Sequence, residues 1–129
     1  MICLVMVGLS FVGCSLLGSL TITQWEKSSD TIVWNSFEDY LLSWKIKITV
    51  SSSGEDLEAG RASLVVNLYD ENGRYDSKRE DDLGPISAGW GATYSFTFLV
   101  DQNYGPDNVY GEALLFIDGK EVDKVVMHF

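Results

Sequence analysis

The stretch SWKIKITV, residues 43–50, alternates between apolar and polar residues without a break. Successive side chains of a β-strand point to opposite faces of a sheet, so a period of two indicates a strand with one buried face and one solvent-facing face. Such strands are typical of antiparallel sheets. We predict a strand here whose buried face is formed by Trp44, Ile46, Ile48 and Val50.

Two later stretches show the same period. RASLVVNLYD, residues 61–70, and TYSFTFLV, residues 93–100, are rich in the β-branched and aromatic residues that strands favour. Together with residues 43–50, these two strands are expected to supply most of the hydrophobic core. Their inward-facing residues are predicted to be Leu64, Val66 and Leu68 in the first stretch, and Tyr94, Phe96, Phe98 and Val100 in the second.

Turn signals separate the predicted strands. DENG, Asp70 to Gly73, is expected to close one hairpin, and Asp118-Gly119 lies between two β-rich runs and predicts another. RYDSKRED, residues 74–81, is predicted to be a charged strand at a sheet edge, where charge discourages aggregation.

The beginning of the domain is harder to assign. Residues 20–25 alternate, which predicts a first strand with Leu20 and Ile22 on one side and Trp25 on the opposite side, together with the neighbouring threonines. The polar run Ser28-Ser29-Asp30 is a turn signal and is expected to end this strand. Residues 32–34 then form a separate short strand in this interpretation.

These elements favour an all-β fold. No stretch after Gly18 has a sustained apolar period of 3.6 residues, and the short strands recur about every ten residues. We predict an antiparallel, immunoglobulin-like β-sandwich of about seven strands over residues 19–129, preceded by an apolar signal or anchor segment over residues 1–18.

The middle of the chain resembles a known family. Residues 65–98 are similar to FxLYD-type domains and related immunoglobulin-like domains of prokaryotic surface proteins, in which a strand ending in Leu-Tyr-Asp precedes a glycine turn. The positions that match this family pattern are Leu68-Tyr69-Asp70, Gly73, Gly89 and Phe96. The resemblance implies an architecture and an extracytoplasmic setting rather than a reaction.

The N-terminal segment is apolar and uncharged, and both cysteines of the chain, Cys3 and Cys14, lie in it. It is compatible with a secretory signal peptide, a lipoprotein signal or an uncleaved membrane anchor. Phe11-Val12-Gly13-Cys14 resembles the lipobox of prokaryotic lipoproteins. The resemblance implies that Cys14 is lipidated and that the protein is extracytoplasmic and anchored to the cell membrane; plain secretion is the alternative. Two or more acyl chains hold a soluble domain at a bilayer where one would not.

Charge and composition narrow the function classes. The 129-residue chain has a net charge of −10, and every charged residue follows Gln24. An acidic surface repels phosphate backbones, so we expect no nucleic-acid partner. The single histidine, His128, is the second-to-last residue of the sequence, and no nucleotide-binding or nucleophile motif occurs. We therefore expect no enzymatic activity, no cofactor and no metal site.

Exposed aromatic residues are the remaining candidates for a binding site. Trp90, Tyr104 and Tyr110 lie in or beside predicted loops. Trp90 lies between two glycines, where its ring either folds back over one end of the sandwich or forms an exposed platform. We expect a binding or structural role toward a protein or glycan at the cell surface. The alternative function is a small carbohydrate-binding module that uses these aromatic residues.

Overall fold

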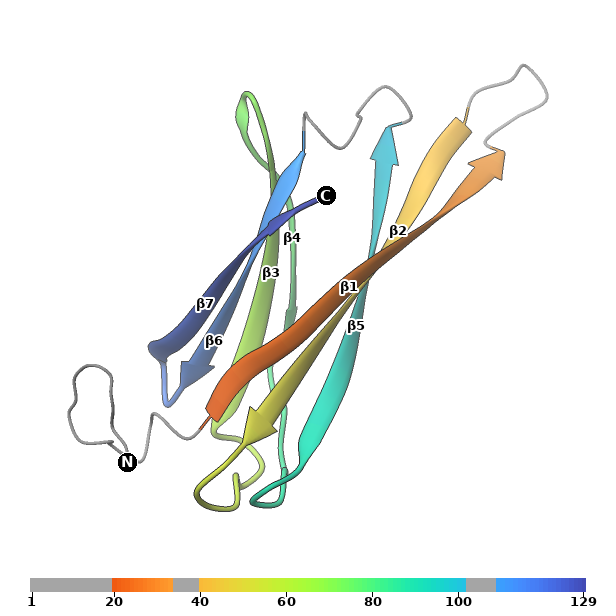
Figure 1. The fold of residues 1–129 in the computed structure, drawn as a ribbon. Helices are drawn as coiled ribbons and strands as arrows, with labels where there is room; N and C mark the ends of the chain where they lie inside the picture. Colours follow the sequence, from red (N-terminus) through yellow and green to blue (C-terminus); the bar gives the residue numbers. More distant parts are fainter. Residues whose placement is uncertain (1–19, 34–39, 102–108) are drawn as a thin grey trace.

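The computed structural model describes residues 20–33, 40–101 and 109–129. They form seven strands and no helix, and the strands pair antiparallel in two sheets (Figure 1). One sheet has the strand order β1-β2-β5, and the other has the order β4-β3-β6-β7. The strand bounds are Leu20–Val33 for β1, Tyr40–Ser52 for β2, Ala62–Asp70 for β3, Gly73–Glu80 for β4, Gly91–Asp101 for β5, Tyr110–Ile117 for β6 and Lys120–His128 for β7.

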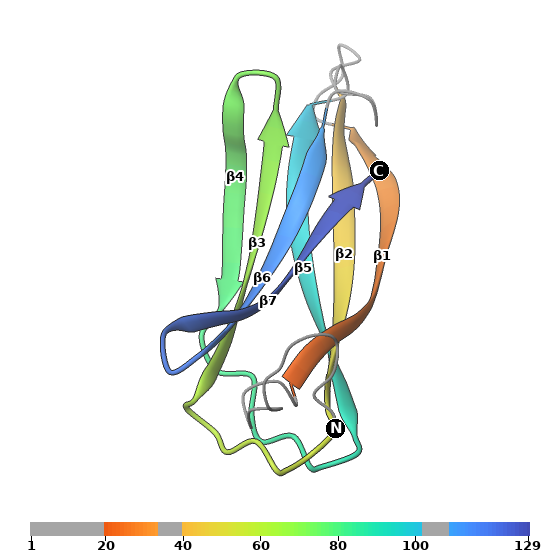
Figure 2. The same cartoon turned by 60° about the vertical axis from the view of Figure 1, so that its left-hand side comes forward.

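This arrangement confirms the predicted all-β, immunoglobulin-like sandwich. The first, second and fifth strands share one sheet, and the third, sixth and seventh share the other, as in immunoglobulin domains. The fourth strand pairs with the third rather than joining the sheet of the first. Figure 2 shows the two layers from a second direction, with β4 at one border of its sheet.

The core lies between the two sheets, where the alternation predicted it. The buried residues of β2 are Trp44, Ile46, Ile48 and Val50, and those of β3 include Leu64, Val66 and Leu68. In β5, Phe96, Phe98 and Val100 are buried, and Tyr94 packs against the core while partly exposed. β6 and β7 add Ala113, Leu115, Ile117 and Met127 from the other side.

The predictions for β1 were wrong in two respects. The strand does not end at Ser28-Ser29-Asp30 but pairs with β2 along its whole length, so residues 32 and 33 belong to it. Ser28, Ser29 and Asp30 are exposed in this edge strand, so their polar side chains remain hydrated. A register shift between Ile22 and Gln24 inserts one extra residue, which moves Trp25 to the same side as Ile22, where it packs against the core.

Both predicted hairpins are present. β3 and β4 join through a turn at Asp70–Gly73, and β6 and β7 join at Asp118-Gly119, where both residues have positive φ, 51° and 82°. That pair of angles is typical of the type I′ turn, whose twist matches the strands it joins. The charged β4 lies at a sheet edge, as predicted.

Several predicted features lie outside the described residues, namely the segment 1–18 with Cys3 and Cys14, and Tyr104. Among the residues that the structure does describe, no helix has the length and apolar character needed to cross a membrane.

Candidate functional site

The outer face of the β4-β3-β6-β7 sheet carries a cluster of aromatic and polar side chains. Cross-strand pairing aligns Tyr69 of β3 with Tyr110 of β6, and Asn67 with Glu112, so that these side chains share one face. Strand β7 adds its outward residues, because Glu112 is paired with Val126 and Tyr110 with His128. We call this surface the Tyr69–Tyr110 face; it comprises Asn67, Tyr69, Tyr110, Glu112, Lys124, Val126 and His128.

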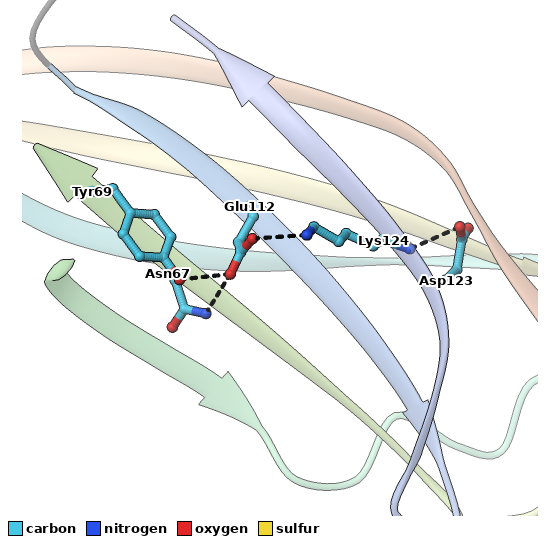
Figure 3. Close-up of polar contacts among 5 residues, drawn as sticks. All are labelled: Asn67, Tyr69, Glu112, Asp123 and Lys124. Carbon is cyan, nitrogen blue, oxygen red and sulfur yellow. Dashed lines mark hydrogen bonds and ion pairs between the residues drawn. The ribbon is translucent and has the colours of Figure 1, made fainter. Parts of the chain in front are cut away.

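Glu112 is the polar centre of this face (Figure 3). The Tyr69 hydroxyl donates to Glu112 Oε1 at 2.6 Å, and the Asn67 side-chain amide donates to the same oxygen at 3.3 Å. The other oxygen, Oε2, lies 3.5 Å from Lys124 Nζ. Ser77 of β4 completes the network by donating to Asn67 Oδ1 at 2.6 Å. Residues from the three other strands of the sheet, β3, β4 and β7, therefore hold this β6 carboxylate in place.

The network changes the protonation of its members in opposite directions. The hydrogen bond from Tyr69 lowers the pKa of Glu112 below its ordinary value of 4.5, and the donors Asn67 and Lys124 act in the same direction. The same hydrogen bond raises the pKa of Tyr69 above 10.0, because the phenol must keep its proton to donate it. At neutral pH the face therefore presents a fixed carboxylate beside a neutral phenol.

The two tyrosines form a stacked pair next to this carboxylate. Their ring centroids lie 5.2 Å apart with an interplanar angle of 17°, and the His128 ring lies 6.4 Å from that of Tyr110. Tyr110 remains 43% exposed, so its ring is open to a ligand. An exposed aromatic ring beside fixed donors and acceptors is able to bind a polar partner by stacking and hydrogen bonding.

Trp90, the other described candidate, lies at the opposite end of the sandwich. It is 71% exposed, so its ring does not fold back over the sandwich end. The Trp90 backbone forms hydrogen bonds with Ser52 and Ser87. This turn lies near the end of the domain where Ile117, the last residue of β6, pairs with Ala62. Tyr110 begins the strand that Ile117 ends, and seven residues of strand separate the two ends by about 24 Å. Trp90 and Tyr110 therefore do not form one platform.

Sequence reasoning found Tyr110 but missed Asn67, Tyr69 and Glu112. Each of these residues alternates with core positions, so an outward direction follows from the sequence. Their convergence depends on the pairing of β3 with β6, which are joined by about forty residues of chain. No local pattern specifies that register.

The described residues contain no group of three or more His, Cys, Asp or Glu side chains able to hold a metal ion. The aspartates around the β3–β4 turn serve the backbone instead. Asp70 Oδ1 accepts from Asn72 N at 2.8 Å, and Asp76 Oδ1 accepts from Ser77 N at 2.7 Å. The bond to Asp70 is typical of aspartate in a tight turn, whereas Asp76 lies within β4.

Comparison with known proteins supports the fold alone. No family model and no curated relative matches the chain. It is similar to the X-ray structure of target SoR45 of the Northeast Structural Genomics Consortium, with 15% identity, a TM-score of 0.51, and coverage of 89% of this chain and 90% of that one. A crystal structure of an endonuclease/exonuclease/phosphatase from Beutenbergia cavernae matches with 6% identity and a TM-score of 0.38, over 86% of this chain and 35% of that chain.

Proposed function

We propose that this chain is an extracytoplasmic lipoprotein, anchored to the cell membrane through Cys14, whose β-sandwich binds a protein partner in the cell envelope without catalysing a reaction. The anchor part rests on the lipobox-like Phe11-Val12-Gly13-Cys14, which ends six positions before Leu20, the first residue of β1. The acidic composition fits a domain that stays in the aqueous phase.

The observation that carries the binding role is the half-exposed Tyr110 ring beside the fixed Glu112 carboxylate. Binding loses less conformational entropy when the contact groups are already held in place. Tyr69, Asn67 and Lys124 hold Glu112, and Tyr110 is held by stacking on Tyr69. The face thus offers a pre-organised aromatic and anionic contact, which suits a partner that presents a basic or hydrogen-bonding group.

A glycan is the second candidate ligand, favoured by the same ring. A sugar ring stacks on an exposed tyrosine, and its hydroxyls hydrogen-bond to a neighbouring carboxylate and ammonium group. Tyr110, Glu112 and Lys124 supply these groups on one face. In this form the carbohydrate-binding alternative rests on Tyr110 rather than on Trp90.

The anchor is tested by intact-mass analysis of the protein extracted from membranes. We expect a chain that begins at Cys14 and carries added acyl mass. A Cys14→Ser variant is the matched control, and it is expected to lack the added mass and to leave the membrane fraction. A wild-type chain that begins at Met1 without lipid contradicts the proposal.

The binding face is tested with Tyr110→Ala, and Leu99→Ala is the matched control. Leu99 is 50% exposed on the other sheet, so its truncation removes similar apolar surface elsewhere. We expect cross-linking to an envelope protein to be lost in Tyr110→Ala and kept in Leu99→Ala. Glycan-array binding with the same dependence supports the glycan candidate instead. Binding that Tyr110→Ala leaves unchanged contradicts the assignment of this face.

A further inference from the structure

We propose that Trp90 is a membrane-contact residue, whose indole ring inserts at the boundary between headgroups and acyl chains of the bilayer that holds the lipid on Cys14. This inference rests on the proposed lipidation of Cys14 and extends it. It gives the domain a defined orientation, in which the Trp90 end lies at the membrane and the Tyr69–Tyr110 end of the sandwich lies away from it.

Trp90 lies at the end of the domain where the chain arrives from the N-terminal segment. Leu20, the first residue of β1, pairs with Ser52 of β2, and Ser52 N donates to Trp90 O at 3.0 Å. These three residues therefore lie side by side on three neighbouring segments of the chain. With about 4.8 Å between adjacent strands, Trp90 lies about 10 Å from Leu20.

The length of chain between Cys14 and Leu20 keeps this end near the bilayer. The two positions are six residues apart in the sequence. Six residues span at most about 20 Å when fully extended, whatever conformation they adopt. A lipid on Cys14 therefore holds the end containing Leu20 and Trp90 close to the membrane surface, whereas the opposite end of the sandwich lies a strand length further away.

The backbone around Trp90 is held firmly while the indole is exposed. Gly89 has a φ of 81°, which favours glycine, and its N–H donates to Ser52 O at 2.6 Å. Trp90 N donates to Ser87 O at 3.0 Å, and Trp90 O accepts from Ser52 N. These three hydrogen bonds fix the turn, yet 71% of Trp90 remains exposed. A large apolar ring displayed on a rigid turn is available for contact with its surroundings.

The interfacial region of a bilayer is a favourable environment for this ring. Tryptophan is enriched at membrane–water boundaries because its indole combines an apolar body with an N–H donor. Exposed Pro85 and Ala88 lie in the same loop and add uncharged surface. Nearby Glu55 and Asp56 are exposed carboxylates, which repel anionic lipid. The geometry therefore points to a neutral, zwitterionic membrane surface.

The test measures the depth of Trp90 in phosphatidylcholine vesicles that carry the full lipidated chain. The chain has four tryptophans, so the Trp90 emission is obtained as the difference between wild type and Trp90→Phe. Nitroxide-labelled lipids quench only a fluorophore that reaches the bilayer. We expect them to remove most of the Trp90 emission, and we expect that emission to lie at shorter wavelength than in a Cys14→Ser protein.

The matched control moves the tryptophan toward the far end of β5, the strand that begins directly after Trp90. In a Trp90→Phe, Leu99→Trp double variant, the new ring lies nine positions from residue 90, about 30 Å away along β5. Leu99 is itself exposed, so the substitution alters no core residue. We expect no lipid quenching of this tryptophan.

Two measurements separate the possible outcomes. If intact mass shows lipid on Cys14 and Trp90 is not quenched, the membrane-contact proposal fails while the proposed lipoprotein function stands. If intact mass shows no lipid, both proposals fail. Equal quenching of Trp90 and of the tryptophan at position 99 also contradicts the proposal, because the domain then has no preferred orientation.

Discussion

Removing one hydroxyl from the Tyr69–Tyr110 face tests whether its network is a pre-organised unit. Tyr69→Phe keeps the stacked ring and deletes the donor that lies 2.6 Å from Glu112 Oε1. A hydrogen bond to a charged acceptor contributes about 1.5–3 kcal/mol, and partial exposure to solvent brings this to the low end. Asn67 still donates to the same oxygen. We expect the free energy of unfolding to fall by about 1–1.5 kcal/mol.

The pH dependence of this loss gives a sharper test. The folded state lowers the pKa of Glu112 below 4.5, so its stabilising contribution is present above that pH and is lost as the pH falls through the folded-state value. The raised pKa of Tyr69 means that its contribution is present below pH 10.0 and is lost as the pH rises through the folded-state value. The difference in stability between wild type and Tyr69→Phe is therefore expected to be largest between about pH 5 and pH 10 and to become smaller below and above that range.

Urea unfolding of both proteins across this range measures the difference, and a cycle with Glu112→Gln isolates the coupling between the two side chains. We expect the effect of Tyr69→Phe to be much smaller in the Glu112→Gln background. A loss of stability that is the same at pH 3 and pH 7, or that is unchanged by Glu112→Gln, would refute the reasoning.

Three further predictions concern the fold and are checked by thermal or urea unfolding. Phe98→Ala removes a fully buried core ring and is expected to lower the free energy of unfolding by about 3–5 kcal/mol. Leu99→Ala, one residue away on the exposed side, should change it by less than about 0.5 kcal/mol, and equal effects would contradict the assigned strand faces. Gly119→Ala should cost about 1 kcal/mol because φ is 82° at that turn position, and an unchanged midpoint would argue against the type I′ turn. Asp123 Oδ2 accepts from Ile22 N at 2.8 Å across the two sheets. Asp123→Ala should therefore lower the free energy of unfolding by about 1–3 kcal/mol, and Asp123→Asn should lower it less. An alanine variant with unchanged stability would show that this contact does not contribute.

The bulge in β1 shows where sequence reasoning reached its limit. Local alternation placed Trp25 with Thr21 and Thr23, because each residue of a regular strand reverses direction. One inserted residue between Ile22 and Gln24 shifts every later side chain of the strand to the other face. In the folded protein, Trp25 packs edge-on against Phe129, 5.9 Å between ring centroids, and this contact across 104 residues of sequence has no local signal.

The polar run at Ser28-Asp30 was interpreted as a turn for a related reason. Serine and aspartate favour turns when nothing else satisfies their backbone groups. Here β2 supplies a continuous hydrogen-bonding partner, and the strand continues to Val33. Pairing with a distant strand therefore outweighed local propensity, as is common for β-structure.

The sequence by itself determined the fold class, the core faces of three strands and both hairpin turns. These features depend on alternation and on residues suited to positive φ, which act between near neighbours along the chain. The tertiary structure alone decided the convergence of Asn67, Tyr69 and Glu112, the inward direction of Trp25, and the separation of Trp90 from Tyr110 at opposite ends of the sandwich. These depend on strand register and sheet order, because hydrogen bonding between distant strands is set by the packing of the whole core rather than by any short stretch.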